Sequence, residues 1–421
     1  MSGKEVQRKV GVAQLVGITF FAVAGGPFGI EGVVGTAGPV IGLAGLVLVP
    51  WLWSLPMALM TAELSTLFPE TGGYIVWIDQ AFGAYLSFLN GGWSIGCNIF
   101  DNALYPALFA IYLRTVWPVL GQTVYSVLLR IFAVAVCTTL NVVGIEFVGV
   151  GAVVLLVLSI APFVALTVFA FYVSATSPFD GEVLNTTSTS YLLSTSTSQW
   201  GTFLSIVLWN TCSYDSAGTC AGEVKSPSKT YPRAMVLTIA IITLSYCLPV
   251  SASLLVEHSN YTLWEEGYFS VIAHTITTKM GGGGGEGGEG GGGTSWLGVW
   301  ISLAAACSSI GLLNTLLCTS SRAVSSLSTN CKLYPLFLSR SHRRFRTPFV
   351  SILLHAVFTF ALSFLDFTVL LEADMFFYCI KLIMEFAAFV RLRRGEWGRE
   401  KREYKVGGGM VGAVALAVFP T

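Results

Sequence analysis

The sequence predicts an all-α protein that crosses a membrane many times, with helices interrupted at corresponding positions of two halves. Three observations predict this fold class: an apolar composition, a series of segments long enough to span a bilayer, and two interruptions within those segments. Of the 421 residues, 54% are apolar and only 11% are charged, whereas a soluble domain carries about a quarter charged residues. This composition excludes a soluble enzyme or a disulfide scaffold. Because 23 basic residues balance 23 acidic ones, no nucleic-acid partner is expected.

Eleven segments approach the roughly 20 apolar residues that a spanning helix needs. They lie near 12–34, 39–66, 83–112, 123–143, 147–173, 201–221, 234–256, 295–321, 348–366, 368–390 and 407–421. We expect spans one to five (12–173) and six to ten (201–390) to form two repeats. The remaining segments are an N-terminus (1–11), a Ser/Thr-rich loop (174–200), a Gly-rich loop (281–293), a basic loop (391–406) and a partial span (407–421). The last span stops at Thr421, so a truncated chain is expected.

The distribution of lysine and arginine predicts the orientation, because these residues favour cytoplasmic segments. A cytoplasmic N-terminus places all but four of the 23 basic residues in cytoplasmic segments. The four exceptions are Arg114, Arg130, Lys279 and the intramembrane Lys381. The Ser/Thr-rich and Gly-rich loops then lie outside, and both have the low complexity of flexible linkers.

The first span is interrupted by glycine and proline, which disfavour a regular helix. The interruption comprises Gly25, Gly26, Pro27, Phe28, Gly29, Ile30 and Glu31. Backbone that leaves a helix at membrane depth is tolerated where it lines a cavity or is buried in protein. It is therefore either a packed kink or a ligand site that offers free amides and carbonyls.

The sixth span has a polar counterpart in its middle, which is too polar to face lipid. It contains Trp209, Asn210, Thr211, Tyr214, Asp215 and Ser216. Spans one and six are the first members of two sets of five. Interrupted helices at corresponding positions are typical of inverted-repeat transporters, which hold the substrate near the middle of the membrane.

Several motifs resemble those of the amino acid–polyamine–organocation superfamily. Gly25–Glu31 is similar to the first-helix signature of its polyamine and cationic amino-acid branch, and Pro69–Trp77 resembles the loop after helix two. Asp101–Pro106 is similar to the polyamine-uptake branch, and Ala221–Val224 with Tyr231–Ala234 matches the loop after helix six. The resemblance extends from about residue 12 to residue 421.

The resemblance implies a LeuT-like five-plus-five inverted repeat with discontinuous helices 1 and 6, followed by two further helices that are truncated here. It implies proton-driven uptake of small cationic solutes. We expect a plasma-membrane location and neither a cofactor nor a metal. Members of the family with a disulfide-linked heavy subunit use a cysteine after span three. Residues 113–122 contain no cysteine, so no such partner is expected.

Carboxylates within the spans are the candidate binding groups. A charged side chain at membrane depth is costly, so it is found where it has a binding partner or a function. Glu31 and Asp215 are the main candidates, since each coincides with an interruption. Asp101 shares a helix face with Tyr105 and either contacts substrate or bonds the backbone of a neighbouring helix. Glu385 is expected to pair with Lys381, four residues earlier. Glu63 and Glu223 are interpreted as helix-end or gate residues.

These acids favour a substrate with several ammonium groups. A fixed Glu31 beside the amides of the first interruption would repel a substrate carboxylate, whereas acids with nearby aromatic rings suit cations. We therefore expect polyamines such as putrescine or spermidine, with Glu31 as the residue that also carries the coupling proton. A sodium site with Ser308 and Ser309 is a weaker interpretation.

Alternatives are a cationic or neutral amino-acid permease, a nutrient sensor that binds without transport, and an inactive fragment. An intramembrane enzyme is not expected, because the spans contain no paired-carboxylate protease motif, HExxH motif or Ser/His pair.

Overall fold

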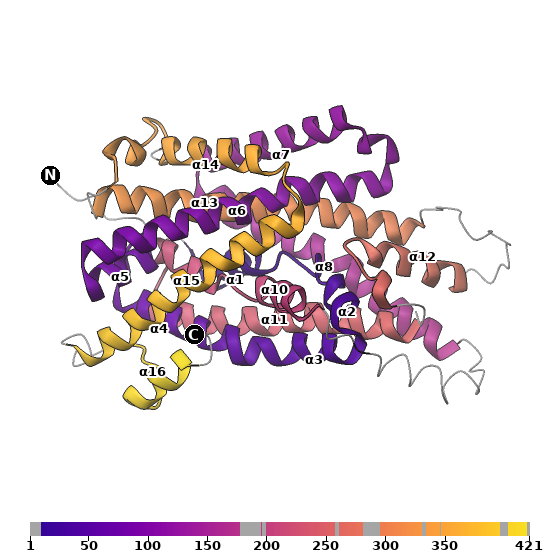
Figure 1. The fold of residues 1–421 in the computed structure, drawn as a ribbon, viewed down its shortest axis with the longest axis horizontal. Coiled ribbons are helices and arrows are strands. Elements are labelled where there is room, and N and C mark those ends of the chain that lie inside the picture. Colours follow the sequence, from indigo (N-terminus) through magenta and orange to yellow (C-terminus); the bar gives the residue numbers. More distant parts are fainter. Residues whose placement is uncertain are drawn as a thin grey trace.

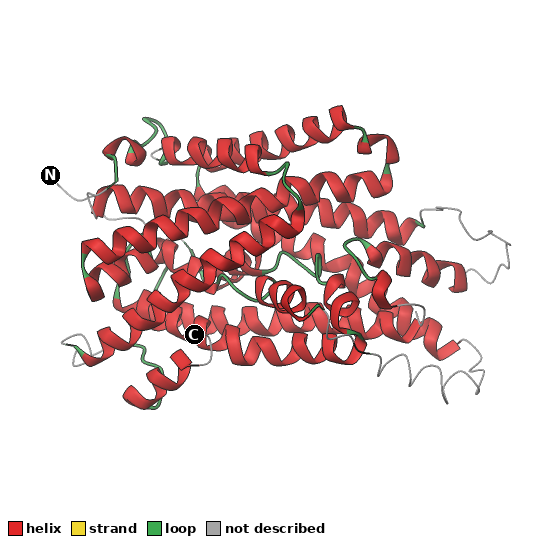
Figure 2. Ribbon diagram, viewed as in Figure 1, coloured by secondary structure: helices red, strands yellow, loops and turns green. Residues whose placement is uncertain are grey.

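The described part of the protein is a bundle of long helices. In the computed structural model the described residues are 10–176, 195, 199–256, 261–280, 295–330, 334–345, 347–395 and 403–418. Figures 1 and 2 show that most helices run nearly along one direction, with short connections at the two ends. The β-structure of these residues is a single isolated bridge between Val10 and Val224. The predicted all-α fold class is confirmed.

The helices begin and end close to the predicted spans. In chain order they are α1 (Val12–Val23), α2 (Glu31–Ala37), α3 (Pro39–Val49), α4 (Leu55–Leu67), α5 (Tyr74–Phe82), α6 (Ala84–Val116), α7 (Thr123–Val143), α8 (Ile145–Thr176), α10 (Trp200–Trp209), α11 (Pro227–Val256), α12 (Tyr268–Met280), α13 (Trp296–Asn330), α14 (Phe349–Leu362), α15 (Phe367–Arg394) and α16 (Gly409–Val418). Shorter helical turns are η1 (Pro50–Ser54), η2 (Pro118–Gly121), η3 (Tyr214–Glu223), η4 (Tyr261–Leu263) and η5 (Leu336–Ser339). Helices α5 and α12 were not predicted from the sequence, and they lie between predicted spans.

Five helical stretches of the described chain are long and apolar enough to cross a membrane. They are Pro39–Leu67, Thr123–Val143, Gly151–Thr176, Pro227–Val256 and Trp296–Thr329. The long helices α6 and α15 do not belong to this set, although they pack closely against each other. Their buried faces carry polar and charged side chains, among them Asp101 and Lys381, and these lower the hydropathy that identifies a span. The chain is thus a multi-pass membrane protein in which these two helices turn their polar faces toward the protein interior.

The Ser/Thr-rich and Gly-rich loops expected outside the membrane lie largely beyond the described residues. Of the Ser/Thr-rich loop 174–200, only residues 174–176, 195, 199 and 200 are described, and none of 281–293 is described. The basic N-terminal residues before Val10 also lie outside the described chain.

Candidate functional site

The first predicted interruption separates α1 from α2. Gly25, Gly26 and Gly29 have φ values of 64°, 127° and 75°, a region that L-residues with side chains rarely adopt. A side chain at Gly25 would also collide with Leu312 and Ser308 of α13. The carbonyl of Gly25 accepts a hydrogen bond from the Ser308 hydroxyl. The glycines therefore allow the non-helical backbone to approach α13 closely.

The second interruption separates α10 from η3. Ser213 has a φ of 65°, and the chain then continues in a 3-10 turn instead of an α-helix. Ser213 donates its backbone N–H to the hydroxyl of Tyr378 at 2.8 Å. The hydroxyl of Tyr246 donates to the carbonyl of Asn210 at 3.0 Å. Side chains of α15 and α11 thus satisfy backbone groups that this interruption leaves without helical partners.

The two interruptions contact each other. Asn210 donates a side-chain N–H to the carbonyl of Gly29 at 3.3 Å, and the Trp209 ring lies against Gly29. A small cavity of about 10 Å³ lies beside this contact, which is room for about one water molecule. It is lined by Val23, Ala24, Phe28, Tyr105, Leu108, Trp209, Asn210, Ser308, Ser309 and Leu312.

Asp101 lies behind the aromatic wall of this cavity. Its Oδ1 accepts a hydrogen bond from the Tyr105 hydroxyl at 2.7 Å and one from Trp209 Nε1 at 3.3 Å. The two rings are stacked, with centroids 6.4 Å apart. The predicted shared face of Asp101 and Tyr105 is confirmed, and the partners of Asp101 are side chains rather than a neighbouring backbone. Asp101 does not itself line the cavity, but a carboxylate directly behind the aromatic rings that do makes this wall suited to a bound ammonium group.

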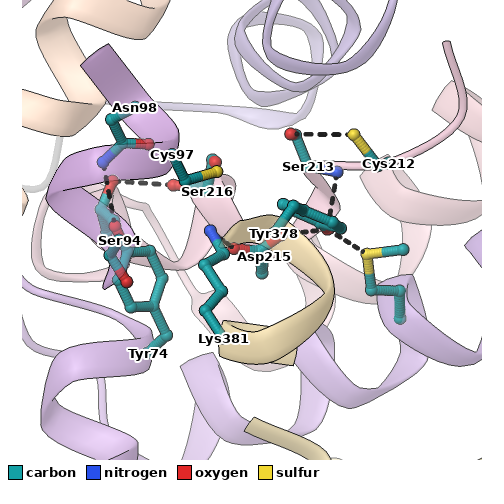
Figure 3. Close-up of polar contacts among 12 residues, drawn as sticks. Tyr74, Ser94, Cys97, Asn98, Cys212, Ser213, Asp215, Ser216, Tyr378 and Lys381 are labelled. Carbon is teal, nitrogen blue, oxygen red and sulfur yellow. Dashed lines mark hydrogen bonds and ion pairs between the residues drawn. The ribbon is translucent and has the colours of Figure 1, made fainter. Parts of the chain in front are cut away.

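Asp215 is held by α15 (Figure 3). Lys381 Nζ lies 2.7 Å from Asp215 Oδ2, and the Tyr378 hydroxyl donates to Oδ1 at 2.7 Å. The ammonium of Lys381 also lies 4.4 Å from the centre of the Tyr74 ring. Both charged side chains are buried. Asp215 therefore already has a cationic partner within the protein.

The predicted pair between Lys381 and Glu385 is not a direct ion pair, although the two charges lie close enough to interact electrostatically. Lys381 pairs with Asp215, and both carboxylate oxygens of Glu385 are buried without a hydrogen-bond partner among the described residues. Helical spacing places Lys381 and Glu385 on one face, but it does not account for an acid that reaches the same lysine from another segment.

Glu31 lies at the start of α2 and contacts the segment before α12. Its Oε1 accepts the backbone N–H of Gly267 at 3.1 Å, just before α12. Its Oε2 is buried and has no hydrogen-bond partner in the described chain. Neither Glu31 nor Asp215 is among the residues that line the small cavity. The structure thus gives the two main candidate acids separate surroundings.

The other predicted residues of the second interruption are buried in its packing. The carbonyl of Thr211 accepts a hydrogen bond from Ser54 at 2.6 Å, and Tyr214 and Ser216 lie within η3. In the first interruption, Gly26, Pro27 and Ile30 do not line the cavity, whereas Phe28 packs edge-on against Phe163 and Tyr112.

Asp374 is an acid that the sequence analysis missed. It is buried on α15, and its Oδ1 accepts a hydrogen bond from the Cys97 thiol at 3.0 Å. It is close enough to interact electrostatically with Asp101, Lys381 and Asp215. The signal was present, because Asp374 lies within the predicted span 368–390, where a charge is costly.

A second buried ion pair lies at the end of the bundle that carries α4 and α16 (left in Figure 1). Arg393 contacts both carboxylate oxygens of Glu63, at 2.9 Å from Nε to Oε1. Arg393 also donates to the carbonyls of Val406 and Gly409, and Val406 N–H donates to Glu63 Oε2. We call Glu63, Arg393, Val406 and Gly409 the clasp. It joins α4 and α15 to the segment before α16.

Comparison with known proteins identifies similar sequences over nearly the whole chain. The amino acid permease family model matches residues 11–420. Polyamine transporter RMV1 of Arabidopsis thaliana is 35% identical over 414 residues, which cover 98% of this chain and 79% of that protein. Polyamine transporter PUT1 of Oryza sativa subsp. japonica is 34% identical over 416 residues, which cover 98% of this chain and 72% of that protein.

Proposed function

Because the chain belongs to the amino acid permease family, we propose that it is a secondary transporter for the uptake of polyamines such as putrescine and spermidine. The observation that carries this proposal is the position of Asp101, which does not itself line the cavity but accepts hydrogen bonds from Tyr105 and Trp209, two residues that do. The names of the similar proteins support the same substrate class.

The buried charges that surround Lys381 favour a substrate with more than one positive group. Four acids, Asp101, Asp215, Asp374 and Glu385, are buried and interact electrostatically with one base, Lys381. If all were ionised, the acids would exceed the base by three charges. A polyamine supplies several ammonium groups and no carboxylate, so it balances this excess. A neutral amino acid supplies no net charge, and an arginine-like substrate supplies only one.

The transport cycle we propose is alternating access around the two interruptions. The five predicted spans on either side of the segment after α8 form a LeuT-like five-plus-five inverted repeat. This arrangement is supported by the interruption in the first helix of each half and by the contact of Asn210 with Gly29. The cavity is too small for a diamine, so substrate entry requires the helices around it to move apart.

Glu31 is the proposed carrier of a coupling proton. It is buried, and one of its oxygens has no hydrogen-bond partner in the described chain. A proton on this oxygen would neutralise the carboxylate when the substrate is absent. We further propose a plasma-membrane location with the clasp end in the cytoplasm, since that orientation follows the distribution of basic residues.

The test is uptake into proteoliposomes of the full chain, with labelled putrescine and competing spermidine, arginine or leucine at two external pH values. We expect competition by spermidine and a faster uptake at the lower external pH. Asp101→Asn should weaken putrescine binding about 10- to 100-fold, because a hydrogen-bonded charged contact contributes roughly 1.5–3 kcal/mol.

Asp79→Asn is a matched control, because it makes the same change on α5, whereas Asp101 is hydrogen-bonded to two residues that line the cavity. Stronger competition by arginine than by spermidine would identify a cationic amino-acid permease. Binding without accumulation would identify a sensor. Unchanged putrescine affinity in Asp101→Asn would exclude the proposed role of Asp101.

A further inference from the structure

One face of α15 carries a column of titratable side chains. Asp374, Tyr378, Lys381 and Glu385 follow one another at spacings of four, three and four residues, which places them on one side of an α-helix. All four side chains are buried. Tyr378 and Lys381 reach the second interruption through Asp215. The face therefore points toward a segment that is expected to move during transport.

Lys381 occupies a site with the chemistry of a receptor for ammonium groups. Its Nζ lies 2.7 Å from Asp215 and at 4.4 Å and 4.9 Å from the ring centres of Tyr74 and Tyr378. A carboxylate with aromatic faces is also the combination that would bind an ammonium group of a polyamine. The protein's own lysine thus holds the position that a substrate ammonium would seek.

Glu385 offers Lys381 a second partner. It lies four residues after Lys381 on the same face, a spacing at which lysine and glutamate side chains can pair. Both its oxygens are buried and without a hydrogen-bond partner in the described residues. An unpaired buried carboxylate is costly, so an approaching ammonium would be favoured. The flexible four-carbon stem of lysine allows its charge to change partner without movement of the helix.

We propose that Lys381 is a tethered counter-ion, which pairs with Asp215 in the empty transporter and moves to Glu385 when a substrate ammonium takes Asp215. In the loaded arrangement the substrate pairs with Asp215 and Lys381 pairs with Glu385, so each of these charges has a partner. Lys381 and Glu385 act through Asp215 and are positioning residues. This inference rests on the proposed transport of polyamines.

The two possible roles of Lys381 predict opposite changes in affinity. A lysine that only holds Asp215 in place would support substrate binding, and its removal would weaken binding. A lysine that competes for Asp215 lowers the apparent affinity by the fraction of molecules in which Asp215 is free. Its removal would therefore strengthen binding.

The experiment measures equilibrium binding of labelled putrescine to the purified full chain in nanodiscs. We expect Lys381→Met to bind putrescine about tenfold more tightly, which corresponds to occupancy of Asp215 by Lys381 in roughly nine molecules of ten. Glu385→Gln should bind severalfold more weakly, because Lys381 then has no second charged partner. In the Lys381→Met background, Glu385→Gln should leave the affinity unchanged, as expected when one residue acts only through another.

Glu372→Gln is the matched control, because it makes the same change at an exposed position of α15. Thermal unfolding and monodispersity identify variants that fold. Glu385→Gln removes no described hydrogen bond, so it tests the inference even if Lys381→Met does not fold.

Three results would overturn the inference while the wild-type chain binds putrescine. These are weaker or equal binding by folded Lys381→Met, unchanged binding by Glu385→Gln, and an effect of Glu385→Gln that persists without Lys381. A folded wild-type chain that binds no polyamine would instead overturn the proposed function, and the tethered counter-ion with it.

Discussion

Helix α15 carries two buried cations, and their surroundings differ. Lys381 lies in the middle of the helix and Arg393 near its end, about 18 Å further along the axis. Each pairs with a buried acid of another segment, Asp215 or Glu63. Arg393 contacts both oxygens of its acid and two backbone carbonyls, whereas Lys381 makes one ion pair beside an acid without a partner.

The difference shows how one helix can combine a fixed contact with an exchangeable one. A guanidinium presents several donors in a planar fork, so its bonds to a carboxylate fix both position and orientation. An ammonium is a compact charge on a flexible stem, and it can change partner at little geometric cost. The clasp is thus suited to holding α15 against α4, and Lys381 is suited to responding to a ligand.

The largest expected effect on stability comes from removal of the clasp. Arg393→Ala should lower the free energy of unfolding by about 3–5 kcal/mol, because it leaves Glu63 buried without its charged partner. Chemical unfolding in detergent measures this change. Arg394→Ala, at the next and exposed position, should change stability by no more than about 0.5 kcal/mol. Equal losses in the two variants would show that the clasp does not hold the helices together.

A smaller loss of unfolding free energy is expected beside the Lys381–Asp215 ion pair. Tyr378→Phe removes the hydroxyl that donates to Asp215 and accepts from Ser213 N–H, and it leaves Lys381 in place. We expect a loss of about 1.5–3 kcal/mol, typical of a hydrogen bond to a charged group. The same unfolding measurement applies. If Tyr378→Phe lost more unfolding free energy than Arg393→Ala, the contacts at the centre of α15 would stabilise the protein more than the clasp at its end.

The smallest effect is expected at Asp374. Cys97→Ala removes the thiol that donates to this acid, and a weak donor of this kind should contribute about 1 kcal/mol. Cys97→Ser supplies a hydroxyl in the same place and should restore part of the loss. If serine and alanine were equally destabilising, the contact with Asp374 would contribute nothing measurable.

The positions of the interruptions could be read from the sequence because their causes are local. Gly25, Gly26 and Pro27 disfavour a helix wherever they occur, and α1 ends just before them. Asp101 and Tyr105 could also be placed on one face, since four residues along a helix return to the same side. Asp374 could have been found by the same reasoning that identified Glu385.

The partners of the buried charges depended on contacts between distant segments. The spacing of Lys381 and Glu385 indicated a pair, but the second interruption brings Asp215 to the lysine from far along the chain. Likewise, Glu63 and Arg393 meet only because α4 and α15 end side by side.

The sequence by itself therefore determined an all-helical membrane protein with two interruptions and several acids at membrane depth. Local backbone propensity and the cost of charge in lipid are properties of short segments, so the chain order reveals them. Only the tertiary structure decided which acid each base pairs with and which acid is left without a partner. That choice depends on distances of a few ångströms between helices, which residue spacing within one helix does not specify.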